Sequence, residues 1–282
     1  MSKLQKSCTW AFGVISAVLT FVPEELFGRY PRLIDISNKI IMVWKSCPLT
    51  SEELSAVFGR VIFFVCIVFI SAMFNFFHSR FREKICIKGR DYCIQVEYGD
   101  LLKQSGWKVI SFDECFTTTV GSSPEDINPS SICGQYLMRY PITNMQQLIT
   151  SAGLSPEREK SEYKNQIRYK SGLLIPNNDY LLMAFARLDK DGKGYFSSRD
   201  EYLQVLSVFW SEVDKYYAQQ DVCIPVLGGG ITRIGDVTPT QQELVDMIIY
   251  SYKLSPHKIK AKIRIVCYKN KEFSLDRVCK TI

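Results

Sequence analysis

The sequence predicts a mixed α/β domain, with strands and helices in layers, that follows a hairpin of two transmembrane helices. Residues 7–23 and 61–77 contain no charged side chain, and apolar runs of this length come close to spanning the hydrocarbon core of a bilayer. From residue 85 onward, short β-branched runs alternate with amphipathic helical stretches. That alternation is typical of an α/β layer fold.

The first apolar run predicts a transmembrane helix over about residues 7–27. A secretory signal peptide is the alternative, because Lys3 and Lys6 precede the run, but no cleavage site of small residues follows and Pro23 closes it. The second run predicts a helix over about residues 58–78, because it is apolar on all sides and ends in a basic segment. A buried core helix is the alternative there.

Basic residues around the two runs predict the orientation of the chain. Lys3 and Lys6 precede the first run, and the second is followed by Arg80, Arg82, Lys84, Lys88 and Arg90. Because basic residues favour the cytoplasmic side, both termini are expected there. We therefore expect a membrane segment over residues 1–84 and a cytosolic domain over residues 85–282.

The segment between the two runs carries apolar residues at helical spacing, namely Leu33, Ile36, Ile40, Ile41 and Trp44. This spacing predicts a short amphipathic helix. It would lie on the outer membrane interface or form a packed cap on an oligomer.

The composition excludes several classes of protein. The chain has 46% hydrophobic residues, which predicts a folded protein. Its net charge of +6 is too small for a dedicated nucleic-acid binder. His78 and His257 are the only histidines, so zinc sites built on paired histidines and Ser-His-Asp catalysis are disfavoured. The 10 cysteines form no C-x-x-C pair. Reduced core thiols in a cytosolic domain are the expected state.

The second part of the chain has five candidate strands and three candidate helices. The strands are residues 93–97, 108–112, 180–188, 222–227 and 259–268, and the helices are residues 130–139, 198–218 and 239–253. The last helix is expected to begin at Pro239 after Thr238. Residues 121–129 and 151–170 are expected to be loops, the second a charged excursion or a flexible lid.

One candidate strand runs straight into Gly228, Gly229 and Gly230, with a helix expected after Pro239. Residues without side chains let backbone N–H groups approach an anion closely, and glycine tolerates the positive φ that such a nest needs. A diphosphate group is the expected ligand of this loop, and Arg233 would add charge-assisted hydrogen bonds to it. The alternative is a plain turn, because the segment is neither a Walker A nor a G-x-G-x-x-G motif.

Residues 96–102, Val-Glu-Tyr-Gly-Asp-Leu-Leu, are followed by a second strand, the glycine-rich loop and a last apolar strand. This order resembles macro domains from about residue 93 to residue 268, and it implies a macro-domain-like mixed sheet flanked by helices. The resemblance implies that adenine is bound by Asp100, by the backbone of Leu101 and by a stacking Tyr268. It implies that the diphosphate is held by Gly228, Gly229, Gly230, Ile231 and Thr232. A turn residue is the alternative for Asp100.

The chain departs from macro domains after the second strand. Their loop there is rich in Asn and Gly, grips the distal ribose and supports hydrolysis, whereas this chain has Asp113 and Glu114 followed by the candidate contact residues Cys115, Phe116, Thr117 and Thr118. Cys115 has no histidine nearby in sequence, so a structural thiol is favoured over a nucleophile. The departure favours ligand binding without turnover, with no catalytic residue and no cofactor.

Two spans followed by such a domain resemble the membrane effectors of the Thoeris anti-phage systems. The resemblance implies a multi-pass protein of the bacterial inner membrane that senses an ADP-ribose derivative, such as an amino-acid conjugate, made from NAD by a TIR-domain partner. It implies that the homo-oligomer assembles or rearranges, disrupts the lipid bilayer and arrests the infected cell. The alternatives are a membrane-anchored ADP-ribosyl hydrolase or nucleotide-processing macro domain, and a structural anchor that recruits partners.

Residues 189–195, Asp-Lys-Asp-Gly-Lys-Gly-Tyr, resemble a calcium-binding EF-hand loop with Gly194 in the sixth position. However, Lys193 occupies the fifth position and Asp200 replaces the bidentate glutamate. A polar turn before the helix at residue 198 is therefore favoured, and no metal site is predicted.

Overall fold

The computed structural model describes residue 13 and residues 31–43, 50–80, 83–123, 125–230 and 232–281. The chain divides into two compact units, Met1–Arg82 and Glu83–Ile282, close to the boundary expected after residue 84. Apart from Gly13, the first predicted span lies outside the described residues. The pairing of two spans into a hairpin therefore stays a prediction.

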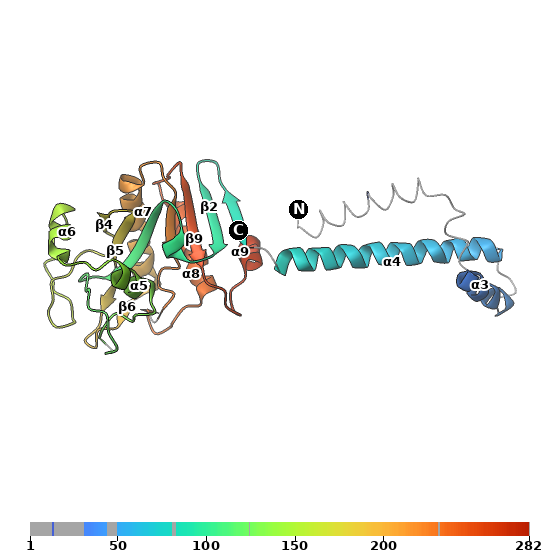
Figure 1. Ribbon diagram of the computed structural model, residues 1–282, viewed down its shortest axis with the longest axis horizontal. Coiled ribbons are helices and arrows are strands. Elements are labelled where there is room, and N and C mark those ends of the chain that lie inside the picture. The colour runs from blue at the N-terminus through green and yellow to red at the C-terminus, as the bar shows by residue number, and fades with distance from the viewer. Residues whose placement is uncertain are drawn as a thin grey trace. The chain divides into compact units, whose positions relative to one another are not determined.

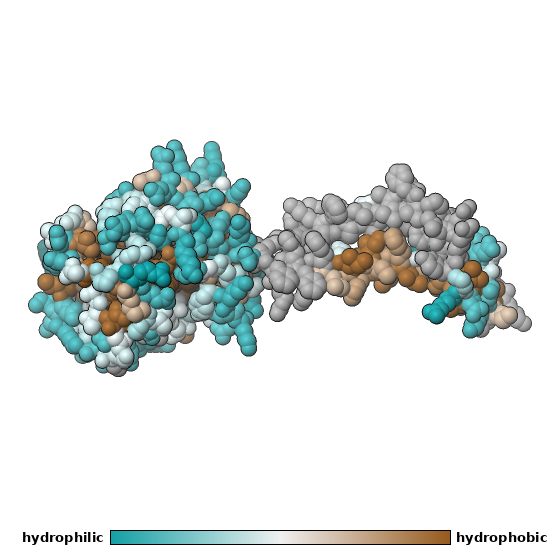
Figure 2. All heavy atoms as spheres, viewed as in Figure 1, coloured by the Kyte–Doolittle hydropathy of each residue, from teal (hydrophilic) through white to brown (hydrophobic). Residues whose placement is uncertain are grey.

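Helix α4 (Ser51–Arg80) of the first unit contains the second predicted span (Figure 1). Its stretch Ser51–Met73, 23 residues long, is the one helix in the described part of the chain that is long and apolar enough to cross a membrane. Apolar side chains line this stretch in Figure 2, and most of its large apolar residues, among them Val61, Phe69 and Ile70, are exposed, unlike those of a helix in a soluble core. Thr50 and Glu53 cap its start reciprocally, with N–H to oxygen distances of 2.8 and 3.3 Å.

Helix α3 (Pro31–Val43) packs against α4 within this unit. It confirms the helix expected from the spacing of apolar residues as far as residue 43, and Trp44 lies outside the described residues. Ser37 is fully buried and donates to the carbonyl of Leu33 at 2.8 Å, whereas Ile36 is exposed. An interfacial position and a role in an oligomer stay predictions.

The second unit is built on one mixed sheet with strands in the order β1-β2-β9-β7-β3-β5-β6-β8, and β4 also pairs with β5. The strands are β1 (Lys84–Lys88), β2 (Cys93–Tyr98), β3 (Trp107–Asp113), β4 (Leu174–Asn177), β5 (Tyr180–Leu188), β6 (Gly194–Phe196), β7 (Val222–Pro225), β8 (Arg233–Ile234) and β9 (Lys262–Cys267). The neighbours β2, β9, β7, β3 and β5 run parallel. Strand β1 is antiparallel to β2, and β4 and β6 are antiparallel to β5, whereas β8 pairs with β6 in parallel.

Helices cover both faces of this sheet (Figure 1). Consecutive residues such as Val109 and Ile110 are both fully buried but belong to different cores, as expected for a strand covered on two sides. One face packs against α7 (Arg199–Tyr216), α8 (Gln241–Leu254) and α9 (Leu275–Thr281). The other packs against the short η1 (Leu101–Lys103), α5 (Ile132–Arg139) and α6 (Met145–Ser151). The predicted mixed sheet flanked by helices is confirmed.

All five predicted strands and all three predicted helices of this unit are present, with corrected ends. Strand β7 stops at Pro225, β9 begins at Lys262, and α8 begins after Thr240 instead of at Pro239. Thr240 and Glu243 form a capping box, with the Thr240 N–H donating to the Glu243 carboxylate at 2.9 Å, and this box defines the start of α8. Strands β1, β4, β6 and β8 and helices α6 and α9 were not predicted from the sequence.

Candidate ligand-binding site

The candidate site lies where the carboxyl ends of the parallel strands meet, which we call the carboxyl edge of the sheet. Tyr98 of β2 pairs with Cys267 of β9, and Val266 of β9 pairs with Pro225 of β7, so these strands end side by side. Strand β3 follows β7 and β5 follows β3, also in parallel. Parallel α/β sheets bind ligands outside the carboxyl ends of their strands. The topology thus brings all the predicted ligand loops to one edge.

Asp100 follows β2 and caps helix η1. One carboxylate oxygen accepts from the Leu102 N–H at 3.0 Å, and the other lies 3.6 Å from Lys103 Nζ. The Asp100 side chain remains 46% exposed, whereas Leu101 is buried beneath it. Asp100 therefore has the turn role given as its alternative, while its side chain remains partly accessible to a ligand.

The glycine loop follows β7, and α8 follows it in the chain as expected, with the short strand β8 between them. Of the three glycines only Gly228 has a positive φ, of 82°. A Cβ on Gly229 would lie 2.9 Å from the Val226 carbonyl oxygen, whereas one on Gly230 would meet nothing within 4 Å. The open side of the loop is therefore at Gly230, where the backbone is accessible to a ligand.

The other predicted ligand residues of this loop, Ile231, Thr232 and Arg233, differ in burial and in polar contacts. Ile231 lies outside the described residues, and Thr232 is half-buried. Arg233 is engaged already, because its Nη2 lies 2.6 Å from Asp189 Oδ2. Asp189 also accepts from the N–H groups of Asp191 and Lys193 at 3.0 and 2.9 Å, so its carboxylate closes a polar turn.

The loop after β3 is held together by the half-buried carboxylate of Asp113. Asp113 accepts from the N–H groups of Cys115 and Thr117 at 2.8 and 3.2 Å and from the Thr117 hydroxyl. Burial raises the pKa of Asp113, and these hydrogen bonds act in the opposite direction. The Thr117 hydroxyl is thus used inside the loop, while Thr118 is half-buried.

Two other candidates in this loop are poorly placed for a ligand. Phe116 is only 2% exposed and packs in the core with ring centroids 5.9 Å from Phe112 and 5.8 Å from Tyr169, so its side chain is not exposed for the predicted ligand contact. Cys115 is half-buried, and burial together with Asp113 raises the pKa of its thiol to about 12. A thiol with this pKa is almost wholly protonated at neutral pH, as expected for a structural cysteine.

Tyr268 directly follows β9 and is 55% exposed. Its backbone carbonyl accepts from Gln241 Nε2 at 3.0 Å, which fixes the end of β9 against the start of α8. The exposed ring stands at the same sheet edge as Asp100, because β9 and β2 are parallel neighbours. Tyr268 is therefore available for stacking.

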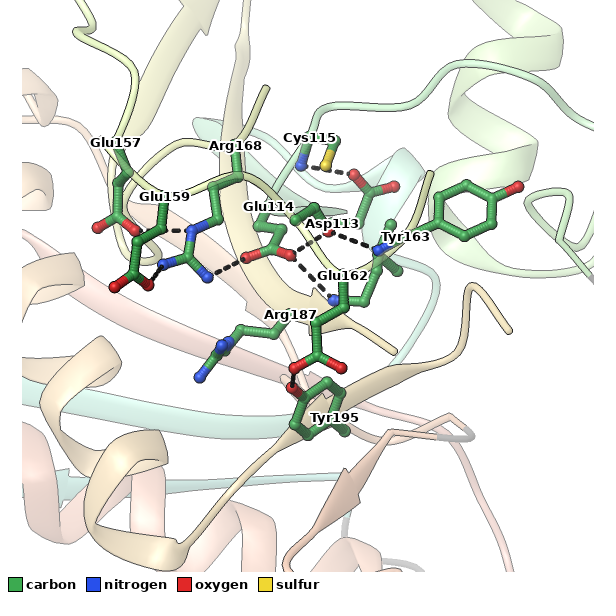
Figure 3. A network of polar contacts seen from close by, with 12 residues as sticks. Asp113, Glu114, Cys115, Glu157, Glu159, Glu162, Tyr163, Arg168, Arg187 and Tyr195 are labelled. Carbon is green, nitrogen blue, oxygen red and sulfur yellow. Dashed lines mark hydrogen bonds and ion pairs between the residues drawn. The ribbon is translucent and has the colours of Figure 1, made fainter. Parts of the chain in front are cut away.

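A buried polar network that was not predicted from the sequence lies beside the β3 loop (Figure 3). Glu114, 2% exposed, accepts from Ser161 Oγ at 2.5 Å and from the Leu188 N–H at 3.2 Å. Arg168 lies 3.7 Å from Glu114 and 2.7 Å from Glu159. Its Nε also lies 3.0 Å from a Glu157 oxygen, but without the alignment of a hydrogen bond.

This network fastens the segment that was expected to be an excursion or a lid. The Tyr169 N–H also donates to the Glu114 carbonyl at 2.8 Å, so residues 157–169 are tied to the end of β3. A cavity of about 210 Å³ adjoins the network and is lined by side chains of both charges, including Glu114, Arg168, Lys170, Arg187 and Glu201. Glutamates at 157 and 159 with Arg168 were the available sequence signal, but only the fold shows that they meet at Glu114.

The mixed sheet, the helices on both faces and the ligand loops gathered at the carboxyl edge define the macro-domain class. The sequence model of the family described as "Thoeris protein ThsA, Macro domain" matches residues 94–268. The chain therefore belongs to the Thoeris ThsA macro-domain family. It is 28% identical over 208 residues to Thoeris protein ThsA of Bacillus amyloliquefaciens (strain Y2), covering 70% of this chain and 69% of that one.

Solved macrodomains of Oceanobacillus iheyensis are also similar. A mutant solved with ADPR has a TM-score of 0.44 and 9% identity over 67% of this chain and 92% of its own. A structure with ADP has a TM-score of 0.42 and 9% identity over 71% of this chain and 98% of its own.

Proposed function

We propose that this protein is a sensor and effector of Thoeris anti-phage defence whose macro domain binds an ADP-ribose derivative without hydrolysing it. The order of loops along the sheet edge carries the proposal: Asp100 follows β2, Tyr268 follows β9, the glycines follow β7 and Cys115 follows β3. With about 4.8 Å between neighbouring strands, these three steps span roughly 14 Å. This order suits adenine at β2 and β9, the diphosphate at β7 and the distal ribose at β3.

The structure of the β3 loop supports binding over turnover. Asp113 is committed to holding the loop, and the Cys115 thiol has a pKa raised to about 12. Neither group is suited to activate water or to attack the distal ribose at neutral pH. A hydrolase would need another acid or base at this end of the site.

We propose further that the ligand is an amino-acid conjugate of ADP-ribose, made from NAD by a TIR-domain partner. Membership of the Thoeris family supports the defence role and an ADP-ribose-type ligand. The cavity beside Glu114 supports the conjugate, because it follows the β3 loop along the same edge and offers both carboxylates and cations. A zwitterionic substituent on the distal ribose would find a partner there for each of its charges.

The membrane part of the proposal rests on α4. One apolar helix is present among the described residues, and the first predicted span would complete a multi-pass anchor in the bacterial inner membrane with both termini in the cytoplasm. Two thin spans cannot form a pore alone, so the proposed output is a homo-oligomer that assembles or rearranges, disrupts the bilayer and arrests the cell. The ligand acts as a switch only if it binds one of two states more tightly.

The test is calorimetry on the full chain in detergent micelles, titrated with ADP-ribose and with its amino-acid conjugates, followed by mass spectrometry of the recovered ligand. Tight binding with intact ligand supports the sensor. Recovered cleavage products would instead support the membrane-anchored ADP-ribosyl hydrolase. The absence of binding by every ligand would contradict the sensor and leave a structural anchor.

A further inference from the structure

Two thiols lie close together on the β1–β2 hairpin. The strands pair with Cys86 opposite Gln95 and Lys88 opposite Cys93. Because alternate residues of a strand share a face, Cys86 and Cys93 stand diagonally on the same face of the hairpin. Their Sγ atoms are 3.5 Å apart, and both cysteines are free.

The position of these thiols is unusual for cysteine. The opposite face of the hairpin carries the core residues Ile85, Ile94 and Val96, whereas Cys86 is exposed and Cys93 is half-buried. Unpaired cysteine is among the residue types most often buried, and Cys133, Cys223 and Cys267 of the same unit follow that rule. The two thiols of the hairpin therefore differ from the core thiols in being both paired in space and accessible.

We propose that Cys86 and Cys93 are a modification site at which a peroxide forms a reversible intramolecular disulfide. The Cys86 thiolate attacks one peroxide oxygen, the O–O bond breaks, and Cys86 becomes a sulfenic acid as the first water leaves. The Cys93 sulfur then attacks the Cys86 sulfur, the S–O bond breaks, and hydroxide leaves with the Cys93 proton as a second water. Two thiols are oxidised by two electrons and one hydrogen peroxide is reduced to two waters. A dithiol reductant reverses the step by exchange.

The surroundings assign the two roles. Burial raises the pKa of the Cys93 thiol, and the neighbouring Cys86 raises it further, whereas Lys262 and Lys88 act in the opposite direction. Cys86 is more exposed and meets the oxidant first, so Cys93 is the resolving thiol. Closing the bond needs the sulfur atoms to approach by about 1.5 Å, to the ~2.05 Å of a disulfide. Among the described strands, β1 is at the edge of the sheet and pairs only with β2, so it can make this adjustment.

The disulfide would join two functionally different strands. Strand β1 follows the apolar helix α4 in the chain, and β2 ends at the Asp100 turn. A covalent link between them restrains the hairpin without touching the candidate ligand loops. The expected physical effect is slower hydrogen exchange of the amides of β1 after oxidation.

Peptide mapping of the full chain in detergent micelles tests the proposal. The chain is treated with hydrogen peroxide, alkylated and digested with trypsin without reduction. We expect the peptides over residues 85–88 and 91–103 to appear joined, lighter by two hydrogens than their sum, and to separate after dithiothreitol. Separate peptides with free thiols, with sulfinic acid only, or joined to other cysteine peptides would overturn the proposal.

Variants and a second probe complete the test. Cys86→Ser and Cys93→Ser should each abolish the joined peptide, whereas Cys133→Ser, which removes a buried thiol, should retain it. Phenylarsine oxide binds two neighbouring thiols together, so the untreated reduced chain should take it up at these peptides. Because this readout needs no variant to fold, failure of the reduced chain to bind the arsenical there would also overturn the proposal.

Discussion

The Tyr98 N–H donates to the Glu83 carbonyl at 3.0 Å. Tyr98 is the last residue of β2 and directly precedes Gly99 and Asp100, while Glu83 is the first residue of the second unit. The Gly99 N–H in turn donates to the Cys267 carbonyl at 3.1 Å, beside Tyr268. The point at which the chain joins the macro domain therefore lies beside the adenine end of the proposed site.

This hydrogen bond predicts which backbone amides become protected from hydrogen exchange when the ligand binds. A ligand held by the Asp100 turn and Tyr268 should steady the end of β2, so the amides of Tyr98 and of β1 should exchange hydrogen more slowly when ADP-ribose or its conjugate is bound. Hydrogen exchange followed by mass spectrometry measures this on peptic peptides that cover β1 and the end of β2. Protection confined to the glycine loop would contradict a link between the site and the start of the domain.

The second prediction concerns Gly230. A Cβ at Gly230 meets nothing within 4 Å, so Gly230→Glu adds a negative charge at the diphosphate position without a clash. The affinity for an ADP-ribose ligand should fall by at least about tenfold, since a tenfold change corresponds to only about 1.4 kcal/mol. Gly230→Ala is the matched control. Calorimetry measures the affinity of both variants, and Gly230→Ala should bind nearly as tightly as the wild-type chain. If Gly230→Glu bound the ligand with the same affinity as the wild-type chain, the diphosphate would not be bound at this loop.

The third prediction concerns the ion pair of Arg233 with Asp189, in which the Arg233 side chain is 48% exposed. If Arg233 contacts the diphosphate, it must leave Asp189. Asp189→Asn should then tighten binding by a few fold, because an exposed pair contributes about 0.2–1 kcal/mol, and Arg233→Ala should weaken it. Titrations of both variants measure the effect. A loss of affinity in Asp189→Asn would show that the pair itself shapes the site.

The sequence predicts the strands and helices that have a long, regular pattern of apolar residues, but not the short strands. The five parallel strands contain apolar runs, rich in Val and Ile in β2, β3, β7 and β9 and in Leu, Met, Ala and Phe in β5, and these runs were sufficient to find them. Strand β1 reads as Lys-Ile-Cys-Ile-Lys and was not predicted as a strand, because one buried and one half-buried isoleucine carry little periodic signal. Strand β8 has only two residues, and its pairing with β6 is visible only in the fold.

The candidate site was predictable as a set of loops but not as a set of side-chain roles. Strand order brings Asp100, Gly228 and Tyr268 to one edge, as the resemblance to macro domains implied. Sequence could not show that Phe116 turns into the core or that Arg233 is held by Asp189, because both depend on contacts between segments distant in the chain. The Glu114 network was missed for the same reason.

The fourth prediction concerns Arg168, whose side chain is 10% exposed beside the 3% exposed Glu114. Arg168→Met would leave the buried Glu114 carboxylate without its cation, which typically costs about 3–5 kcal/mol of unfolding free energy. Urea denaturation of the full chain in micelles, followed by tryptophan fluorescence, measures the change. The double variant Glu114→Gln with Arg168→Met should recover much of the loss. If the double variant were no more stable than Arg168→Met alone, the two charges would not be coupled.

The last prediction is a pH dependence set by Asp113. Because burial raises its pKa in the folded chain, the folded state binds a proton more tightly there than the unfolded state does. Between the unfolded pKa, about 3.9, and the higher folded value, the Asp113 contribution to stability falls as pH rises. Asp113→Asn keeps an oxygen that accepts from Cys115 and Thr117 but cannot titrate, so this component should disappear. Urea midpoints of both proteins across this range provide the measurement, and parallel pH profiles would show that Asp113 keeps an ordinary pKa in the fold.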